Sequence, residues 1–281
     1  MKYLNASASR PFVHIKPKKG WQVIDLKELK EYRDLFYFLV ARDIKVRYKQ
    51  TVLGGLWAII QPFFSMVVFT LFFGKLARIP SDGVPYPIFN FTAMIAWTYF
   101  SNAITGSGNS LIGNTQLVSK VYFPRIIIPI APVLAGLLDF SIAFTILVFL
   151  MFYFHVYPTP MAFLLPFLVF VMMLTASGVG TFLAALNAKY RDIKYTIPLL
   201  VQLWMFVSPV VYPTSMIPGK YRFLYSLNPL SGVIEGFRSI LLGTGPFPTQ
   251  MVLISGSLSL ALFIIGISYF KQVERSFADI I

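Results

Sequence analysis

Two acidic side chains lie in otherwise apolar parts of the sequence, and they are the first candidates for chemistry. Asp139 falls inside a long apolar run, and Glu235 falls inside a shorter one. An ionisable group in an apolar layer is costly, so by default it marks a functional site. For Asp139 two interpretations stay open. It is either a functional group in a transport pathway or a buried acid satisfied by neighbouring Ser, Asn or Tyr side chains.

Glu235 has a candidate partner, because Arg238 follows three residues later on the same helical face. A structural ion pair that braces a short helix is favoured over a proton relay. Removing one partner of a desolvated pair leaves the other charge uncompensated. We therefore expect Glu235→Ala to impair function more than the double change Glu235→Ala/Arg238→Ala.

The sequence holds none of the usual patterns of metal or nucleotide chemistry. With no Cys and two His, it offers no disulfide framework, no thiolate site and no His-rich zinc site. The patterns GxxxxGK[ST], HExxH and GxSxG do not occur. We expect no catalytic residue, no metal site and no cofactor bound by this chain.

The elements that position these residues are predicted to be membrane helices. Of 281 residues, 57% are hydrophobic and 12% are charged, against about 45–50% and about 25% in ordinary soluble domains. One soluble core of this length cannot bury so much apolar surface, and disorder requires low hydrophobicity. The composition therefore predicts an all-α membrane protein with several spans.

Six apolar segments are predicted to cross the membrane. Residues 52–73 carry no charge, and at about 1.5 Å per residue they can cross a hydrocarbon core of about 30 Å. The other five segments are residues 88–104, 126–154, 161–186, 195–212 and 251–270. Residues 105–119 are rich in Gly, Ser and Asn, which predicts a polar connection with room for a short helix.

The distribution of basic residues predicts the topology. The net charge is +13, and 12 of the 24 Lys and Arg residues lie in residues 1–49. With both termini inside, the cytoplasmic segments hold 19 Lys and Arg residues and the external segments hold 5. The positive-inside rule thus favours cytoplasmic termini, and nucleic-acid binding is not expected. Residues 1–20 show no signal peptide.

The chain ahead of the first span divides into two parts. Residues 1–24 are predicted to be a flexible polar lead. Residues 25–50 are predicted to form an amphipathic helix in the membrane interface, with Asp25 and Glu28 as a capping box. The alternative is a helix packed on protein. The apolar face of this helix consists of Leu29, Tyr32, Phe36, Leu39, Val40 and Ile44.

The remaining residues, 51–281, are predicted to form one six-span domain with an unusual segment, residues 213–250, between spans five and six. This segment contains five Pro residues and two apolar pieces, residues 221–227 and 233–242, that are too short to cross. Lipid does not tolerate irregular backbone, so short re-entrant helices shielded by protein or water are expected.

Aromatic side chains cluster near the middle of the second predicted span and at the end of the third. Trp97, Tyr99 and Phe100 form the first cluster. Aromatic residues at span ends are normally interfacial anchors. The alternative is a stacking surface for sugar rings in a pore.

Four motifs give the sequence a family resemblance. They are residues 47–54 with Leu56-Trp57 and Gln61-Pro62, residues 120–125, residues 186–192, and residues 228–230 with 235–238. In this order and at these membrane positions, they resemble the permease subunits of polysaccharide-exporting ABC transporters over about residues 25–275. The likeness is greatest to exporters of lipid-linked O-antigen, and teichoic-acid and capsule exporters share the architecture.

The resemblance implies a homodimer that exports an undecaprenyl-linked polysaccharide from the cytoplasm across the bacterial inner membrane. Two copies of a separate ATP-binding subunit would bind ATP and Mg²⁺. Residues 213–250 would form the external gate, braced by Glu235 and Arg238. The expected ATPase-docking residues are Arg33, Arg42, Lys120, Tyr122 and Arg125. The expected entry site for the lipid headgroup consists of Arg47, Lys49, Leu53 and Gly54.

Two other functions are alternatives to polysaccharide export. A membrane-embedded transferase acting on polyprenyl lipids usually needs clustered acids for a metal, and here the acids are scattered. An ABC permease for another lipid or a drug would share the fold. Neither the glycan nor its length follows from the sequence.

Overall fold

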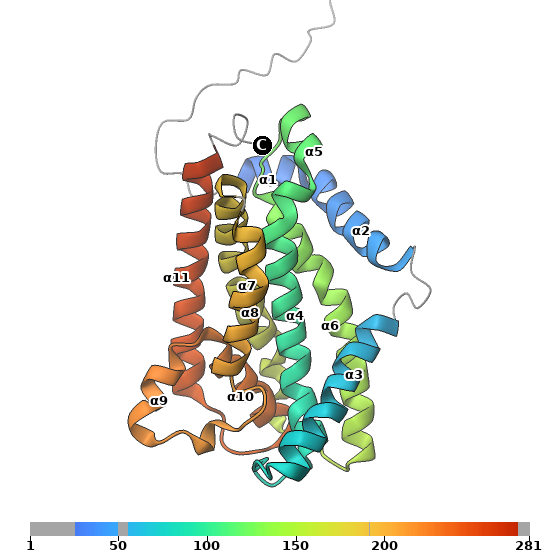
Figure 1. Cartoon of the computed structure of the whole chain (residues 1–281), viewed down its shortest axis with the longest axis vertical. Coiled ribbons are helices and arrows are strands. Elements are labelled where there is room, and N and C mark those ends of the chain that lie inside the picture. The colour runs from blue at the N-terminus through green and yellow to red at the C-terminus, as the bar shows by residue number, and fades with distance from the viewer. Residues whose placement is uncertain (1–25, 50–55, 191, 275–281) are drawn as a thin grey trace, which may run out of the picture.

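The computed structural model describes residues 26–49, 56–190 and 192–274, and within those ranges it contains helices and no strand (Figure 1). The helices are α1 (Leu26–Glu31), α2 (Arg33–Lys49), α3 (Trp57–Phe69), η2 (Thr70–Leu76), α4 (Tyr86–Gly113), α5 (Thr115–Lys120), α6 (Ile127–Tyr153), η3 (Pro160–Leu164), α7 (Leu165–Lys189), α8 (Ile193–Val207), η4 (Thr214–Met216), α9 (Gly219–Ser226), α10 (Pro229–Leu242) and α11 (Thr249–Glu274).

Four helical segments of the described chain are long and apolar enough to cross a membrane. They are Ile59–Leu76, Ile127–Tyr153, Pro160–Lys189 and Thr249–Glu274. The fold class of an all-helical membrane protein is therefore confirmed. α8 has 15 residues, which at about 1.5 Å per residue is shorter than a bilayer core. α4 has 28 residues, but its C-terminal half is rich in Gly, Ser and Asn.

The sequence-based end of the second span was wrong, because α4 continues to Gly113 and the expected connection is helical. Its small residues serve close packing. A Cβ on Gly108 would lie 2.7 Å from Ile197 of α8, and one on Gly180 of α7 would collide with the Ser107 side chain. Small residues let membrane helices approach closely, so this polar stretch is a helix contact.

Two hydrophobic clusters hold the bundle together. The larger one joins α4, α6, α7 and α10. The smaller one lies where α2 packs on the ends of the long helices, and its fully buried members include Leu39, Leu111 and Phe270. α2 is thereby fixed to the bundle by apolar packing.

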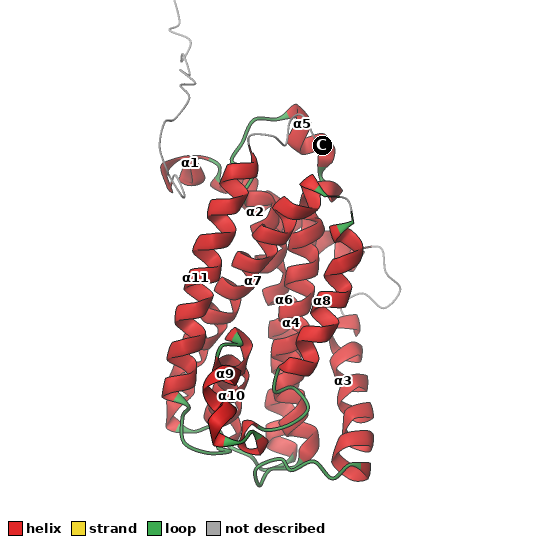
Figure 2. Cartoon of the chain, turned by 60° about the vertical axis from the view of Figure 1, so that its left-hand side comes forward, coloured by secondary structure: helices red, strands yellow, loops and turns green. Residues whose placement is uncertain are grey.

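The two ends of the bundle carry different elements (Figures 1 and 2). α1, α5 and the C-terminal end of α11 gather at one end, which we call the basic end, and α9 and α10 lie toward the other. The described segments that the sequence analysis assigned to the cytoplasm, around residues 120–125, 189–190, 192–194 and 271–274, share the basic end. Charge counting thus grouped the connections correctly.

Candidate functional site

The face of α2 predicted to be apolar points at the bundle. Leu39 is buried, and Leu29, Tyr32, Phe36 and Val40 pack around it. Tyr37, Phe38 and Val46 of the same helix are 77%, 62% and 68% exposed. The helix therefore packs on protein through Leu39 and also leaves apolar side chains exposed.

Two of the predicted docking residues make contacts inside the subunit. Arg42 donates to the Asn114 side-chain oxygen at 2.7 Å and to Asp43 at 2.8 Å. Arg125 donates to the Glu274 carbonyl at 3.1 Å. These contacts tie α2 to the α4–α5 corner and the 121–126 loop to α11.

The other predicted docking residues are accessible at the basic end. Arg33, Lys120 and Tyr122 are exposed, and Arg33 lies 3.4 Å from the equally exposed Asp34. Such a surface ion pair contributes little to stability. This face has the positive charge and the exposure that a docking partner needs.

Asp139 has two partners, both on the last turn of α2. Arg47 forms an ion pair with one carboxylate oxygen, and the Tyr48 hydroxyl donates to the other. Burial and this hydrogen bond raise the pKa of the Tyr48 hydroxyl, so it stays protonated. The acid is therefore satisfied, partly by Tyr as one interpretation held, and it fastens the end of α2 to α6.

The structure also places Asp139 relative to the first span. Arg47, Asp139 and Gln61 line the same cavity, and Gln61 belongs to the second turn of α3. The acid thus lies beside the start of α3, and within α6 it is near the middle of the candidate span Ile127–Tyr153. Lys49 is exposed at the end of α2, whereas Leu53 and Gly54 lie outside the described residues.

The aromatic cluster on α4 belongs to the core. Trp97, Tyr99 and Phe100 are at most 5% exposed. Phe100 meets Trp204 of α8 edge-on with ring centroids 5.1 Å apart, and the Tyr99 hydroxyl donates to the Val133 carbonyl at 3.0 Å. Of the three, Tyr99 alone reaches the cavity beside Asp139.

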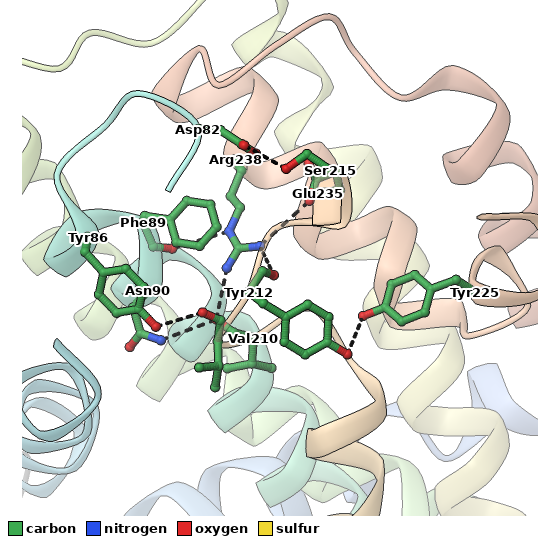
Figure 3. Close-up of polar contacts among 11 residues, drawn as sticks. Asp82, Tyr86, Phe89, Asn90, Val210, Tyr212, Ser215, Tyr225, Glu235 and Arg238 are labelled. Atoms are coloured by element: carbon green, nitrogen blue, oxygen red, sulfur yellow. Dashed lines mark hydrogen bonds and ion pairs between the residues drawn. The ribbon is translucent and has the colours of Figure 1, made fainter. Parts of the chain in front are cut away.

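Arg238 is the one charged residue of the described chain that is fully buried (Figure 3). Its side chain is fully buried and donates to the carbonyls of Phe89, Val210 and Tyr212 at 3.4, 2.9 and 3.3 Å. The guanidinium also lies 3.6 Å from the centre of the Phe89 ring, a cation–π arrangement. One side chain of α10 therefore joins α4 to the loop after α8.

Glu235 makes a smaller contribution than the sequence suggested. It lies 3.7 Å from Arg238, and its Oε2 atom accepts no hydrogen bond from the described residues. The ion pair expected between these residues is present, but carbonyl oxygens hold the arginine. The geometry therefore favours the opposite order of effects, with the double change more damaging than Glu235→Ala.

Sequence reasoning did not find two polar residues that join elements. Tyr48 was quoted only as part of a motif. The Asn228 side chain caps α10 by accepting from the Leu230 amide at 3.1 Å, and it also accepts from the Trp204 indole at 3.0 Å. Asn directly before Pro at a helix start is a known capping pattern, so the first of these roles was accessible from the sequence.

The geometry defines a class of protein: a helical membrane subunit with an exposed basic end. Comparison with known proteins identifies the family. Residues 34–242 match the family model described as ABC-2 type transporter. The chain belongs to this family of transport subunits, and membership of the family implies an ATP-binding partner.

Individual relatives match over most of their length. The chain is 27% identical to the O-antigen export system permease protein RfbA of Klebsiella pneumoniae, over 88% of this chain and 95% of the relative. It is 28% identical to the protein of the same name from Myxococcus xanthus, over 90% and 98%. It is 24% identical to the polysialic acid transport protein KpsM of Escherichia coli, over 70% and 77%.

Proposed function

We propose that this chain is the transmembrane subunit of an ABC exporter that moves an undecaprenyl-linked polysaccharide, O-antigen above all, out of the cytoplasm across the bacterial inner membrane. The observation that carries the proposal is the near full-length match to two O-antigen export permeases. The basic end supports it, because it offers exposed Arg33, Lys120 and Tyr122 to an ATP-binding subunit.

In this proposal the active unit is a homodimer with two ATP-binding subunits, which supply the ATP and Mg²⁺. α4 and α8 complete six spans, both termini and the basic end face the cytoplasm, and residues 213–250 form a re-entrant external gate. Residues 1–24 remain a lead, 25–50 the interface helix and 51–281 the permease domain. The exposed apolar side chains of α3 and α8 provide surface for lipid or for the second subunit.

The direct test is deletion of the gene in its host. Loss of surface polysaccharide, with lipid-linked glycan accumulating in the inner membrane, is the expected result. Rescue should require this chain together with a hydrolysis-competent ATP-binding subunit. Turnover of a lipid-linked sugar donor by the purified chain alone would instead support the transferase alternative.

Docking has its own test. Charge reversal at Arg33 and Lys120 should reduce co-purification of the ATP-binding subunit without changing the thermal stability of the permease, because both side chains are exposed. Arg42→Glu is the matched comparison. It should lower stability as well, since Arg42 bonds to Asn114. Unchanged co-purification of the Arg33/Lys120 variant would place docking elsewhere.

A further inference from the structure

A cavity of about 370 Å³ lies between the end of α2, the start of α3 and the facing sides of α4 and α6. Ligand pockets in proteins typically measure about 300–1,000 Å³, so this one is of ligand size, at the small end. The helices around it come from four separate parts of the chain. The bundle therefore leaves an unfilled space between these helices.

Polar side chains that bond to no described residue line this space. Gln61 of α3 and Thr98, Asn102 and Thr105 of α4 all face the cavity, and their side chains form no hydrogen bond within the described chain. By contrast, Thr92 on the same helix bonds to the carbonyl of Ile88 at 2.8 Å. Amide and hydroxyl groups left open at a cavity can both donate and accept hydrogen bonds to a ligand.

The charges of the cavity favour a neutral ligand. Arg47 and Asp139 are the charged side chains among its lining residues, and they are paired with each other. An anion would meet the Asp139 carboxylate, and a cation would meet the Arg47 guanidinium. Tyr99 and Phe140 add aromatic surface against which the C–H face of a ring can pack. Open hydroxyls and amides, aromatic surface and zero net charge together match a sugar ring.

The position of the cavity fits a sugar that is attached to a lipid. Gln61 and Pro62 lie near the start of the first candidate span, so the cavity lies beside the end of α3 that follows α2. The outer side of α3 is apolar, with Phe64 62% exposed. A headgroup can therefore reach the cavity from the membrane while its lipid chain stays among lipids.

We propose that this cavity binds a neutral sugar residue of the exported lipid-linked glycan, on the side of the membrane that the basic end faces. This inference rests on the proposed function and names the site at which that substrate is first recognised. Gln61, Thr98, Asn102 and Thr105 would make hydrogen bonds to sugar hydroxyls, and Arg47 and Asp139 would form the polar wall. The volume of the cavity limits the ligand to one or two sugar rings. The site would therefore bind the end of the polymer that is attached to the lipid.

The test measures binding to the permease in complex with its ATP-binding subunit in nanodiscs, without ATP. The probes are farnesyl diphosphate carrying one N-acetylglucosamine, farnesyl diphosphate alone, and methyl N-acetylglucosaminide. Thr98→Val and Asn102→Leu keep the side-chain volume and remove hydrogen-bonding groups. Ser101→Ala is the matched control, because Ser101 is on the same helix and does not line the cavity.

Thr98→Val/Asn102→Leu should weaken binding of the sugar-bearing lipid at least about tenfold, as loss of two hydrogen bonds of about 1 kcal/mol each predicts. Binding of farnesyl diphosphate should not change, and Ser101→Ala should bind like the unaltered protein. If the methyl glycoside binds as tightly as the sugar-bearing lipid, the cavity is still a sugar-binding site, but its ligand is a soluble glycan. Equal losses for both lipids, or no loss for either, would overturn the proposal.

Export is measured separately in cells. If the cavity variant loses sugar binding and surface polysaccharide together at normal membrane levels, the proposed function and this inference both stand. If binding is lost as expected while deletion of the gene leaves surface polysaccharide intact, the sugar site stands and the proposed function fails.

Discussion

Two arginines, one toward each end of the bundle, are both paired with an acid, yet their surroundings differ. Arg238 is fully buried and is held by three backbone carbonyls, with Glu235 at 3.7 Å as a lesser partner. Arg47 is 31% exposed and faces a cavity beside Asp139 and Tyr48. The partners of Arg238 are mainly backbone groups, whereas the partners of Arg47 are side chains that can rotate.

The difference separates a structural site from a binding site. The carbonyl oxygens of α4 and of the loop after α8 cannot leave Arg238 without a movement of the backbone. Asp139 and Tyr48 can change partners through side-chain rotation alone, and the space beside them is unfilled. A charged residue in a membrane protein is therefore best interpreted from what satisfies it, not from its presence in an apolar segment.

The largest effect is expected at Arg238. Arg238→Met removes the bonds to Phe89, Val210 and Tyr212 and leaves Glu235 without its ion-pair partner, so the loss should approach about 3–5 kcal/mol. The membrane level of the protein should fall sharply, and purified protein should unfold at a much lower temperature. Arg238→Lys keeps the charge but loses the fork geometry and the stacking on Phe89. It should rescue only in part, and full rescue would show that charge alone matters.

A smaller effect on stability is expected at Asp139. Asp139→Ala removes the ion pair with Arg47 and the acceptor of the Tyr48 hydroxyl at a partly exposed site, which should cost about 1 kcal/mol. Asp139→Asn can still accept from Tyr48 and should cost less. Thermal unfolding of the two variants beside Arg238→Met checks this order. A loss at Asp139 as large as the loss at Arg238 would break the distinction between the two sites.

The smallest effect is expected at Glu235. Glu235→Gln removes the charge of a side chain whose Oε2 atom bonds to no described residue, while carbonyls continue to hold Arg238. Surface polysaccharide and membrane level should stay near normal. The double change Glu235→Ala/Arg238→Ala should resemble Arg238→Ala alone. A severe loss of surface polysaccharide or of membrane level with Glu235→Gln would show that the ion pair is the main support of α10.

The sequence predicted the class and the arrangement of the connections, because apolar runs and basic residues mark spans and ends directly. It also predicted two short helices within residues 213–250, where α9 and α10 form. It did not predict the length of α4. Gly and Ser are typical of loops in water, but between membrane helices they permit close contact.

The sequence also did not predict contacts between side chains that lie far apart along the chain. The pairing of Asp139 with Arg47 and Tyr48 joins residues about 90 positions apart, and no local pattern encodes it. The carbonyl partners of Arg238 also cannot be identified from the sequence, because every residue has a backbone carbonyl. The sequence therefore indicated only the nearby Glu235, whose ion pair with Arg238 is present at 3.7 Å.

The arginine of α10 also imposes an order on assembly. Its acceptors, at residues 89, 210 and 212, all precede it in the chain, so each has already been synthesised when residue 238 leaves the ribosome. The positive charge therefore finds its carbonyl acceptors as soon as α10 folds and need not wait in the bilayer for a later segment, although α11 must still pack on α10 to complete the bundle.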